Sequence, residues 1–536
     1  MGFVSGALQL DPTYQTSKHI AFVCFVPGSS HITWVLRFLD ELASRGHNVT
    51  FVTVDQNAKY GADYSRINTV TIDIPDNDMS KIMAQIDSHP DFVSILPMMI
   101  EKMTRTWGYG FDGVKDFIEN NKVDTFICDH RTDACIDAVH AKKLPMILTA
   151  TLGMFADAST SYTNNHLLTL SEYTTKDQTL SRRFYNKFLL PLSVLYRAKP
   201  ALSDLAALKR SRGLTGESSE EKGKHALKII SSLFGVETPR PVGPLIELVG
   251  PLMAKTYPGL DPEFDHYLAT HQRVAYVAFG QHAVPDAFDV ERVLTALAIQ
   301  YEKGHIDGII WSSRYAQPDR FATKLTTPLR HYDLTGCFGT DEKEQGLLRD
   351  LMVTRWSPQM AVLMHPSVSV FVSHGGSNSL FEALHVGKRM IFYPFFGDQP
   401  GTAKQLSQYG LSEYFDHKTD PALINERVEK VILDQEGTYQ HHVERYQALI
   451  QIHGKAAPGR AADLVEEVAF ANQGYGKAYL LPHREDVGHS IPWLKRHNLD
   501  IYGIALVMLG STLGLFAWGL NRLRRAYGVV QKAKTL

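Results

Sequence analysis

The sequence predicts an α/β protein made of two consecutive doubly wound domains and one C-terminal membrane-spanning helix. A chain of 536 residues is long enough for two large domains or three small ones. Apolar strands alternate with amphipathic helices in two separate stretches, as in parallel sheets covered by helices on both faces. The run 501–520 contains no formally charged residue and is long enough to cross a bilayer. The formal net charge of -2 gives no chain-wide attraction for nucleic acid, so no nucleic-acid partner is expected.

The first domain is predicted at 19–250, after an N-terminal leader, 1–18, that lacks the basic and apolar regions of a signal peptide. Its elements, in order, are the strand 20–26, the turn 27–30, a helix with its apolar face at 35–43, the strand 48–54, the strand 123–128, the helix 134–142 and the strand 145–149. This alternation predicts right-handed β-α-β units and a parallel sheet. The aromatic-rich stretch 154–228 has no strand pattern and predicts an inserted helical lobe.

A proline- and glycine-rich connection at 238–252 and a linker at 251–264 precede the second domain, which is predicted at 265–455. Its elements are the strand 274–279, the helix 288–301, the strands 306–311, 351–356 and 368–372, a helix from about Asn378 and the strand 390–393. A cleft is expected between the two domains. A helix at 456–475, with Pro458 placed to start it, is predicted to cross back to the first domain.

The apolar run 501–520 matches the roughly 30 Å thickness of the hydrocarbon layer. Tyr502 and Trp518 lie near its two ends, as interfacial aromatic residues do. The tail 521–536 is basic and favours a cytoplasmic tail with the main body in the lumen. Because no export signal is evident at the N-terminus, a body on the cytosolic side stays open as the alternative.

Cysteine usage and acidic clusters indicate no redox framework and no metal site. The four cysteines are too sparse for a disulfide framework, and Cys24, Cys128 and Cys135 lie in or beside apolar segments typical of buried free thiols. The run 76–78, Asp-Asn-Asp, follows Pro75 and is interpreted as a solvated turn rather than a metal-binding motif. Scattered histidines such as His282, His365 and His385 are interpreted as surface or core residues.

The stretch 355–399 carries the strongest chemical signal. The strand 368–372 delivers Ser373, His374, Gly375 and Gly376 to the start of a helix, where unpaired backbone N–H groups favour an anion. Ser377, Asn378 and Ser379 add side-chain donors, and Glu382 lies one turn further along. A phosphate at the helix start, with a sugar diol beside the carboxylate, is a natural ligand for this arrangement.

This stretch resembles the donor signature of the UDP-dependent glycosyltransferases, which have the GT-B architecture of two facing Rossmann-like domains. The resemblance implies that Trp356 stacks on the uracil, that Gln359 contacts the uridine and that Glu382 binds the ribose. It further implies that His374, Ser377, Asn378 and Ser379 hold the diphosphate, and that Asp398 and Gln399 contact the transferred sugar. Gly280 and Gly376 are further residues expected to bind the UDP-sugar. Membrane-bound members of the family share the C-terminal span, which implies an endoplasmic reticulum or other endomembrane location.

The first domain resembles the family more weakly, at two residues that follow predicted strands. His31 matches the histidine that serves as catalytic base, and Asp129 matches the aspartate that orients it. An acceptor hydroxyl must lose its proton as it attacks, and a histidine held by a carboxylate can take that proton. Asp133 and Asp137 are rival carboxylates nearby.

The resemblance implies an inverting transferase that moves a hexose, glucose or alternatively glucuronic acid, from a UDP-sugar to a hydroxyl of a small lipophilic acceptor. No cofactor or metal is expected, because the UDP-sugar is a co-substrate. The chain departs from the family at Gln281, where Ser or Thr is usual, and at Thr402, where Asn is common. A UDP-sugar epimerase and an inactive membrane-tethered binding protein remain the alternatives, and Gln281 favours the second.

Overall fold

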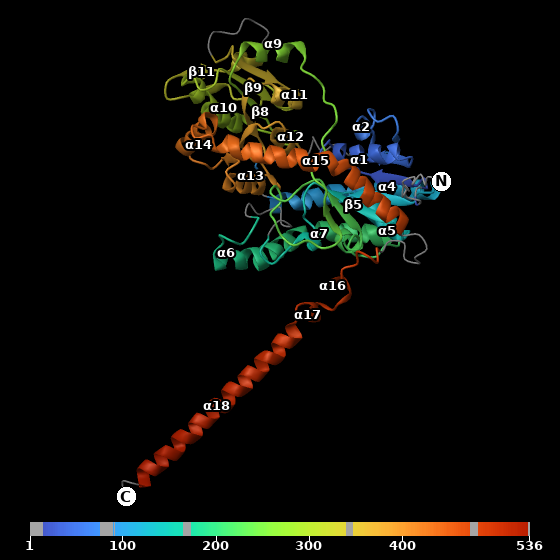
Figure 1. The fold of residues 1–536 in the computed structure, drawn as a ribbon, viewed down its shortest axis with the longest axis vertical. Coiled ribbons are helices and arrows are strands. Elements are labelled where there is room, and N and C mark those ends of the chain that lie inside the picture. Colours follow the sequence, from blue (N-terminus) through green and yellow to red (C-terminus); the bar gives the residue numbers. More distant parts are fainter. Residues whose placement is uncertain are drawn as a thin grey trace, which may run out of the picture. The chain divides into compact units, whose positions relative to one another are not determined.

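The computed structural model describes residues 14, 16–75, 89–90, 92–163, 173–338, 347–471 and 481–533. The chain divides into two compact units, 1–481 and 482–536. The first unit contains two parallel sheets with helices packed against them, which confirms the predicted α/β class (Figure 1). The acidic run 76–78 and the ends of the predicted segments 1–18 and 456–475 lie outside the described residues.

The first sheet has seven parallel strands in the order β3-β2-β1-β4-β5-β6-β7. Its strands are β1 His19–Val23, β2 Asn48–Thr53, β3 Asn68–Thr71, β4 Thr125–Asp129, β5 Met146–Ala150, β6 Leu227–Ile230 and β7 Ile246–Leu248. The helices among them are α1 Thr33–Ser44, α2 Asp55–Ala58, α4 Phe92–Asn120, α5 Asp133–Ala141, α6 Leu180–Phe184, the π-helix η2 Tyr185–Leu189, α7 Leu190–Ser211 and α8 Ser219–Lys222, with the 3-10 turn η1 Ala156–Ala158.

Alternation along β1 explains why this sheet is buried on both faces. Ile20 and Phe22 pack with α1 on one face, whereas Ala21 and Val23 pack with α4 and α5 on the other. In register, Val23 pairs with Val52 of β2 and Cys128 of β4. The carboxyl ends of β1 and β4 therefore lie side by side, and the chain segments that follow them share one edge of the sheet.

The second sheet has six parallel strands in the order β12-β9-β8-β13-β14-β15. Its strands are β8 Val274–Ala278, β9 Gly308–Ser312, β12 Leu351–Thr354, β13 Val368–Ser373, β14 Arg389–Phe392 and β15 Ser412–Tyr414, and β10 Lys324–Thr326 pairs with β11 His331–Asp333 as a separate ribbon. The helices are α9 Pro262–Thr270, α10 Ala287–Glu302, α11 Gln359–Met364, α12 Ser377–His385, α13 Gln399–Gln408 and α14 Pro421–Leu433, with the 3-10 turn η3 Thr335–Phe338.

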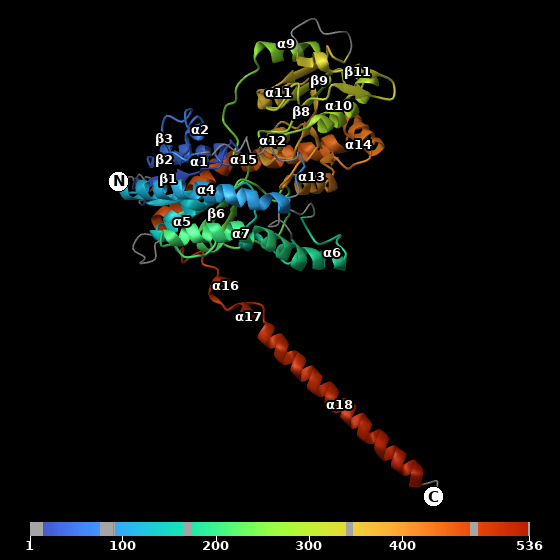
Figure 2. The ribbon, with the colours of Figure 1, turned by 180° about the vertical axis from the view of Figure 1, so that it is seen from behind.

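Helix α15 Thr438–Ala471 packs against elements of both sheets (Figures 1 and 2). Val443 and Ile450 belong to the core around α12, whereas Ala461 and Val465 belong to the core around α1. The expectation that Pro458 starts a helix is wrong, because Pro458 lies inside this continuous helix. Proline removes only one helical hydrogen bond, and the packing on both sides of it compensates for that loss.

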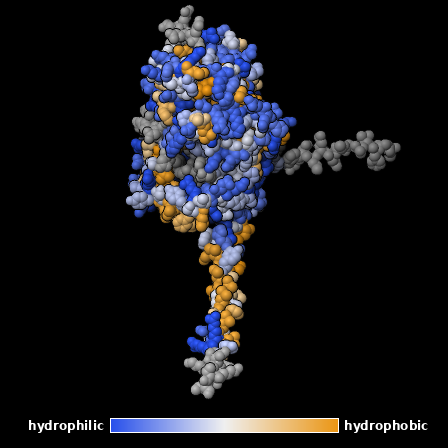
Figure 3. Space-filling model, turned by 90° about the vertical axis from the view of Figure 1, so that its left-hand side faces the viewer, coloured by the Kyte–Doolittle hydropathy of each residue, from blue (hydrophilic) through white to orange (hydrophobic). Residues whose placement is uncertain are grey.

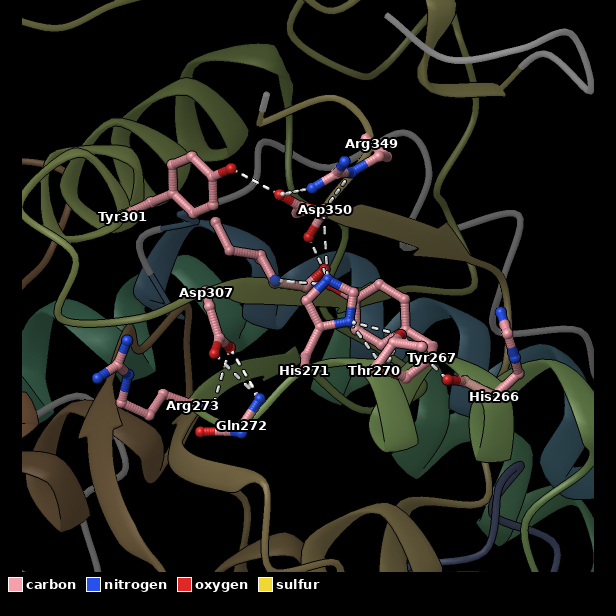
Figure 4. A network of polar contacts seen from close by, with 11 residues as sticks. His266, Tyr267, Thr270, His271, Gln272, Arg273, Tyr301, Asp307, Arg349 and Asp350 are labelled. Carbon is pink, nitrogen blue, oxygen red and sulfur yellow. Dashed lines mark hydrogen bonds and ion pairs between the residues drawn. The ribbon is translucent and has the colours of Figure 1, made fainter. Parts of the chain in front are cut away.

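A polar network holds the amino-terminal edge of the second sheet (Figure 4). Asp350, just before β12, accepts hydrogen bonds from the Tyr301 hydroxyl at 2.6 Å and from Arg349 at 3.0 Å, and pairs with His271 at 3.3 Å. The Tyr267 hydroxyl donates to the carbonyl oxygen of Ile309 at 3.1 Å. Ligands of doubly wound sheets bind at the opposite, carboxyl edge, so this network supports the fold.

The expectation that Cys128 and Cys135 are free thiols is wrong. They form a disulfide with their Cα atoms 5.8 Å apart, whereas Cys24 and Cys337 are free and buried. Cys128 lies near the end of β4 and Cys135 in the first turns of α5, and the β-α turn between them brings the two side chains together. Burial among apolar residues suits a disulfide as well as a thiol, so the sequence pattern could not separate the two.

The second unit contains α16 Val487–Ser490, α17 Trp493–Arg496 and α18 Leu499–Ala533. The part Leu499–Tyr527 of α18 is long and apolar enough to cross a membrane, by length and composition. It includes the predicted span 501–520. The basic segment that follows continues the same helix as far as Ala533.

Candidate functional site

Two adjoining cavities lie at the carboxyl edges of the two sheets. The His31 cavity, of about 310 Å³, is lined by His31, Arg131, His374, Asp398 and their neighbours. The Trp356 cavity, of about 750 Å³, is lined by Trp356, Gln359, Glu382 and their neighbours. The residues that line both are Pro27, Ser29, Gly280, Gln281, His282, Asn378 and Ser379. Loops from both sheets therefore enclose one continuous site, and the structure brings nearly all of the residues singled out in the sequence to it.

His31 and Asp129 form a hydrogen-bonded pair beside the His31 cavity. His31 follows the turn after β1, Asp129 ends β4, and the Nδ1 atom of His31 donates to Oδ2 of Asp129 at 2.7 Å. Burial raises the pKa of Asp129, but the charge of His31, its hydrogen bond to the carboxylate and the nearby His130 outweigh it and hold this pKa well below its usual range. The carboxylate is therefore ionised, and it fixes the tautomer that leaves Nε2 of His31 as the available base.

The rival carboxylates are engaged elsewhere. Asp137 is buried and pairs with Lys209 at 2.8 Å, with Lys222, and with the indole N–H of Trp107 at 2.9 Å. Asp133 pairs with Lys209 at 3.5 Å. Neither contacts His31, so the geometry selects Asp129.

His130 is a neighbour that the sequence did not single out. Its ring stacks on that of His31 with centroids 5.5 Å apart, and its Nδ1 donates to the carbonyl oxygen of Thr149 at 3.1 Å. Burial lowers the pKa of His130, which keeps the ring neutral. The donor atoms of His31, Asp129 and His130 lie within 4.8 Å of one another, a spacing at which three such groups could also hold a metal ion.

His374 lies between the end of β13 and the start of α12, facing the His31 cavity. A Cβ atom at Gly376 would clash with its Nε2, and one at Gly280 would lie 2.9 Å from it, so both glycines make room for this ring. Burial and the nearby His282 lower the pKa of His374 to about 4. The neutral ring has a buried Nδ1 without a hydrogen-bond partner among the described residues, next to the unpaired N–H groups of α12.

The side chains of Gln359 and Glu382 form a fixed polar wall of the Trp356 cavity. The amide nitrogen of Gln359 donates to Glu382 at 2.7 Å and to the hydroxyl of Ser379 at 3.1 Å. Burial raises the pKa of Glu382, partly offset by the hydrogen bond from Gln359. Trp356 is 63% exposed, which excludes a core-packing role and leaves the indole face free for a planar ligand.

Four basic side chains line the Trp356 cavity, and the sequence did not indicate them as site residues. Arg37, Lys59, Arg314 and Arg355 all line it. Arg37 comes from α1 of the first sheet, and its charge acts on the Glu382 carboxyl of the second. No local motif marks these residues, because they meet only when the two sheets face each other.

Asp398 and Gln399 begin α13 and line the His31 cavity. Burial raises the pKa of Asp398. The side-chain oxygen Oε1 of Gln399 accepts hydrogen bonds from the backbone N–H groups of Phe395 and Phe396, at 2.9 and 3.3 Å, which leaves the side-chain amide nitrogen for other contacts. Tyr173 of the first unit's helical lobe donates to the carbonyl oxygen of Asp398 at 2.8 Å and contacts Thr402 at 2.9 Å.

Comparison with known families shows to which family the chain belongs. The sequence profile of the family described as "UDP-glucoronosyl and UDP-glucosyl transferase" matches residues 23–525. The chain belongs to this family. It is therefore a glycosyltransferase that takes its glycosyl group from a UDP-sugar, with the GT-B fold that the sequence predicted.

Individual relatives are distant in sequence. The chain is 24% identical to "UDP-glycosyltransferase FPY2" of Fusarium mangiferae, over 92% of this chain and 96% of that protein. It is 24% identical to "UDP-glucuronosyltransferase 3A1" of Mus musculus, over 54% of this chain and 49% of that one. Among solved structures, a UDP-glucose: anthocyanidin 3-O-glucosyltransferase in complex with UDP aligns with a TM-score of 0.57 at 18% identity, over 84% of this chain and 99% of that one.

Within this UDP-glycosyltransferase, Gln281 and His282 follow Gly280 in the loop after β8. The side-chain oxygen of Gln281 accepts a hydrogen bond from the backbone N–H of Ser29 at 3.3 Å, so this loop of the second sheet is tied to the first. His282, interpreted from the sequence as a surface or core residue, is half-buried and lines both cavities. Burial and the charge of His31 lower the pKa of His282.

Proposed function

We propose that this UDP-glycosyltransferase inverts the anomeric carbon as it moves a hexose to a hydroxyl of a small lipophilic acceptor. The observation that carries the proposal is the hydrogen-bonded pair of His31 and Asp129 on the cavity that also holds His374 and the start of α12. A base and an anion-binding helix start on one cavity are what a single displacement at a sugar phosphate requires.

The donor would occupy both cavities. The exposed face of Trp356 would stack on the uracil, with Gln359 beside the uridine and Glu382 on the ribose hydroxyls. Gly280, His374, Gly376, Ser377, Asn378 and Ser379 would surround the diphosphate. With its pKa near 4, His374 is neutral and would donate a hydrogen bond to the leaving phosphate, while the helix dipole and Arg314 supply positive potential.

The proposed chemistry is one displacement. Nε2 of His31 takes the proton of the acceptor hydroxyl, the acceptor oxygen attacks the anomeric carbon, and the bond from that carbon to the diphosphate oxygen breaks. Asp129 stabilises the imidazolium as it forms. The carboxyl that lines the His31 cavity, Asp398, has a raised pKa, which disfavours a carboxylate nucleophile and a two-step retaining route.

The lining of the His31 cavity supports a proposal for the sugar and the acceptor. Asp398 and the amide nitrogen of Gln399 suit the hydroxyl groups of a neutral hexose, and we propose glucose, with glucuronic acid as the alternative because Arg131 lies on the same cavity. The rest of the wall contains Ile95, Met99 and Leu152. Such apolar side chains favour a small lipophilic alcohol or phenol over a polar acceptor.

The membrane helix completes the proposal. Helix α18 would anchor the enzyme in the endoplasmic reticulum or another endomembrane, with the basic tail in the cytosol. The disulfide between Cys128 and Cys135 supports a body on the lumenal side, because disulfides persist in oxidising compartments. Protection of the body from added protease in sealed membranes tests this side.

An acceptor panel tests the proposed reaction. Full-length enzyme is incubated with UDP-glucose or UDP-glucuronic acid and a set of lipophilic alcohols and phenols, and UDP release and product are measured. The proposal expects acceptor-dependent UDP release and a β-linked product, read from the anomeric proton coupling. An α-linked product would refute the inverting mechanism, and conversion of the UDP-sugar alone would indicate epimerase chemistry.

A further inference from the structure

The helices α6, η2 and α7 present large apolar side chains on their outer surface. Leu180, Phe184, Phe188, Leu192 and Tyr196 recur every four residues, and the exposed fraction of these side chains ranges from 55% at Phe184 to 82% at Tyr196. The sixteen steps along the chain from Leu180 to Tyr196 correspond to a stripe roughly 24 Å long. We call these five residues the outer stripe.

The outer stripe is not the packing face of these helices. Leu190, Val194 and Ala198 already face inward, where they pack with α4 residues such as Val93 and Ile100. A surface helix of a water-soluble body normally places polar side chains opposite its packing face. Helix α7 is apolar on both sides at its start, and a contiguous exposed apolar surface of this kind marks a docking site. Figure 3, which faces the side where α6 lies in Figure 1, shows orange surface on the lower part of the body.

The formal charges on the helical segment that carries the outer stripe are all positive, and Asp177 lies just before it. Arg182, Arg183, Lys187, Arg197 and Lys199 are exposed, and no Asp or Glu occurs from 178 to 203. Lysine and arginine beside an exposed apolar face are the composition of helices that lie in the interface of an anionic bilayer. A partner protein with a mixed charge pattern would not require this uniform sign.

A third cavity, of about 390 Å³, lies against the same helices. Arg183, Phe184, Asn186 and Phe188 line it, together with Gln178. Asn186 is only 3% exposed, and neither its side-chain oxygen nor its nitrogen has a partner among the described residues; the same holds for the amide atoms of Gln178. Buried amides without partners are costly. Asn186 lies in the π-helix η2, a departure from α-helical geometry that is frequent at functional sites, and Gln178 lies just before α6. The cavity therefore fits a polar ligand with phosphate and hydroxyl groups.

We propose that the segment 180–199 docks onto the surface of an anionic phospholipid bilayer, as a membrane contact separate from α18. The outer stripe inserts at the boundary of headgroups and acyl chains, the five basic residues face anionic lipid, and a phospholipid headgroup enters the cavity at Asn186 and Gln178. A bilayer that holds α18 keeps the body tethered nearby, which raises the effective concentration for this second contact. The proposal does not depend on the sugar, the acceptor or the catalytic mechanism.

Depth measurement by spin labelling tests the docking. The full chain is prepared as Leu192→Cys, labelled with a nitroxide and placed one molecule per lipid nanodisc; Cys24 and Cys337 are buried, so the introduced thiol reacts. In discs with about one-third phosphatidylserine, the label should be accessible to oxygen and shielded from a water-soluble nickel complex. The matched control is Met364→Cys, an equally exposed side chain on α11, whose label should stay accessible to nickel. Nickel accessibility at 192 equal to that at 364 would overturn the proposal.

Charge and cavity variants separate the parts of the proposal. Combined Arg182→Glu, Arg183→Glu and Lys187→Glu should lower the ratio of docked to free label at 192 by at least about tenfold. Asn186→Leu should leave the label embedded but reduce the preference for phosphatidylserine over phosphatidylcholine by about threefold, and an unchanged preference would refute the headgroup role of the cavity. None of these residues lines the two catalytic cavities, so turnover in detergent reports whether each variant folds. A second copy of the chain, rather than lipid, would be the occupant of the outer stripe if two results came together. These are short distances between labels at 192 in vesicles that hold several copies, and no shielding of the label from nickel in single-copy discs.

Discussion

Replacement of Asp129 by Asn tests the proposed base most directly. Asn is nearly the same size as Asp, so the variant keeps the packing of the end of β4 but removes the charge that faces Nδ1 of His31. The Asp129 side chain is 1% exposed and lies 2.7 Å from His31, so the imidazolium that forms in the transition state would lose a partner shielded from water. Centres of charge about 4 Å apart interact by about 4 kcal/mol at an effective dielectric constant of about 20.

That interaction corresponds to about a 10³-fold fall in kcat, which lies within the range of about 10² to 10⁴ for a general base. The affinity for UDP should not change, because Asp129 does not line the Trp356 cavity. The assay is initial-rate UDP release at saturating UDP-sugar and acceptor, with UDP affinity measured by calorimetry on the same sample. His31→Ala should fall by a similar factor, and the double variant should fall little further, since the two residues act as one unit.

Asp133→Asn is the matched control for Asp129→Asn. It removes a carboxylate four positions along the chain, one that pairs with Lys209 rather than with His31, and it should leave kcat within about twofold. If Asp129→Asn keeps more than about a tenth of the wild-type kcat, or if Asp133→Asn loses as much, the assignment of the base and its partner is wrong.

Three further outcomes are expected. Glu382→Ala should weaken UDP binding by about 10- to 100-fold, because it removes a charged hydrogen-bond acceptor for the ribose, and calorimetry with UDP that gives the wild-type affinity would contradict that role. Gln281→Ala should lower kcat/KM by about 2- to 10-fold, the net worth of the hydrogen bond to Ser29, whereas an unaltered value would show that the tie between the sheets does not matter for turnover. Asp350→Asn should cost about 1 to 3 kcal/mol of stability at neutral pH without loss of activity. Burial raises the pKa of Asp350, but hydrogen bonds from Arg349, Tyr301 and His271 outweigh it and lower this pKa. The stabilisation is therefore present above the unfolded pKa and is lost as the pH falls through the lower, folded value. Thermal unfolding from neutral to acidic pH should show the stabilities of the wild type and Asp350→Asn converge, and a constant difference between them would refute this reasoning.

The sequence could predict those parts of the site that depend on contacts close along the chain. The strand β13, the glycines after it and the helix α12 follow one another directly along the chain. The position of His374 at the start of the helix could therefore be predicted from the sequence. The strands β6 and β7 were missed for the opposite reason. They are only four and three residues long, and β7 lies in a stretch rich in proline and glycine that also reads as a connection. Their pairing with the rest of the sheet stabilises them, rather than any local preference.

Contacts between segments that are distant along the chain could not be predicted from the sequence. These contacts connect the two halves of the site. His89, just before α4, pairs with Asp289 of α10 at 2.6 Å, and its ring stacks on Phe395 with centroids 5.1 Å apart. Tyr173 holds the carbonyl oxygen of Asp398 from the helical lobe. His89 and Tyr173, from segments between strands of the first sheet, thus contact the loop 395–398 of the second sheet. Helix α4 also supplies Ile95 to the wall of the His31 cavity. If the sugar binds against this loop and the acceptor against α4, as proposed, both substrates would share these contacts, and the effect of each on the affinity for the other would be equal.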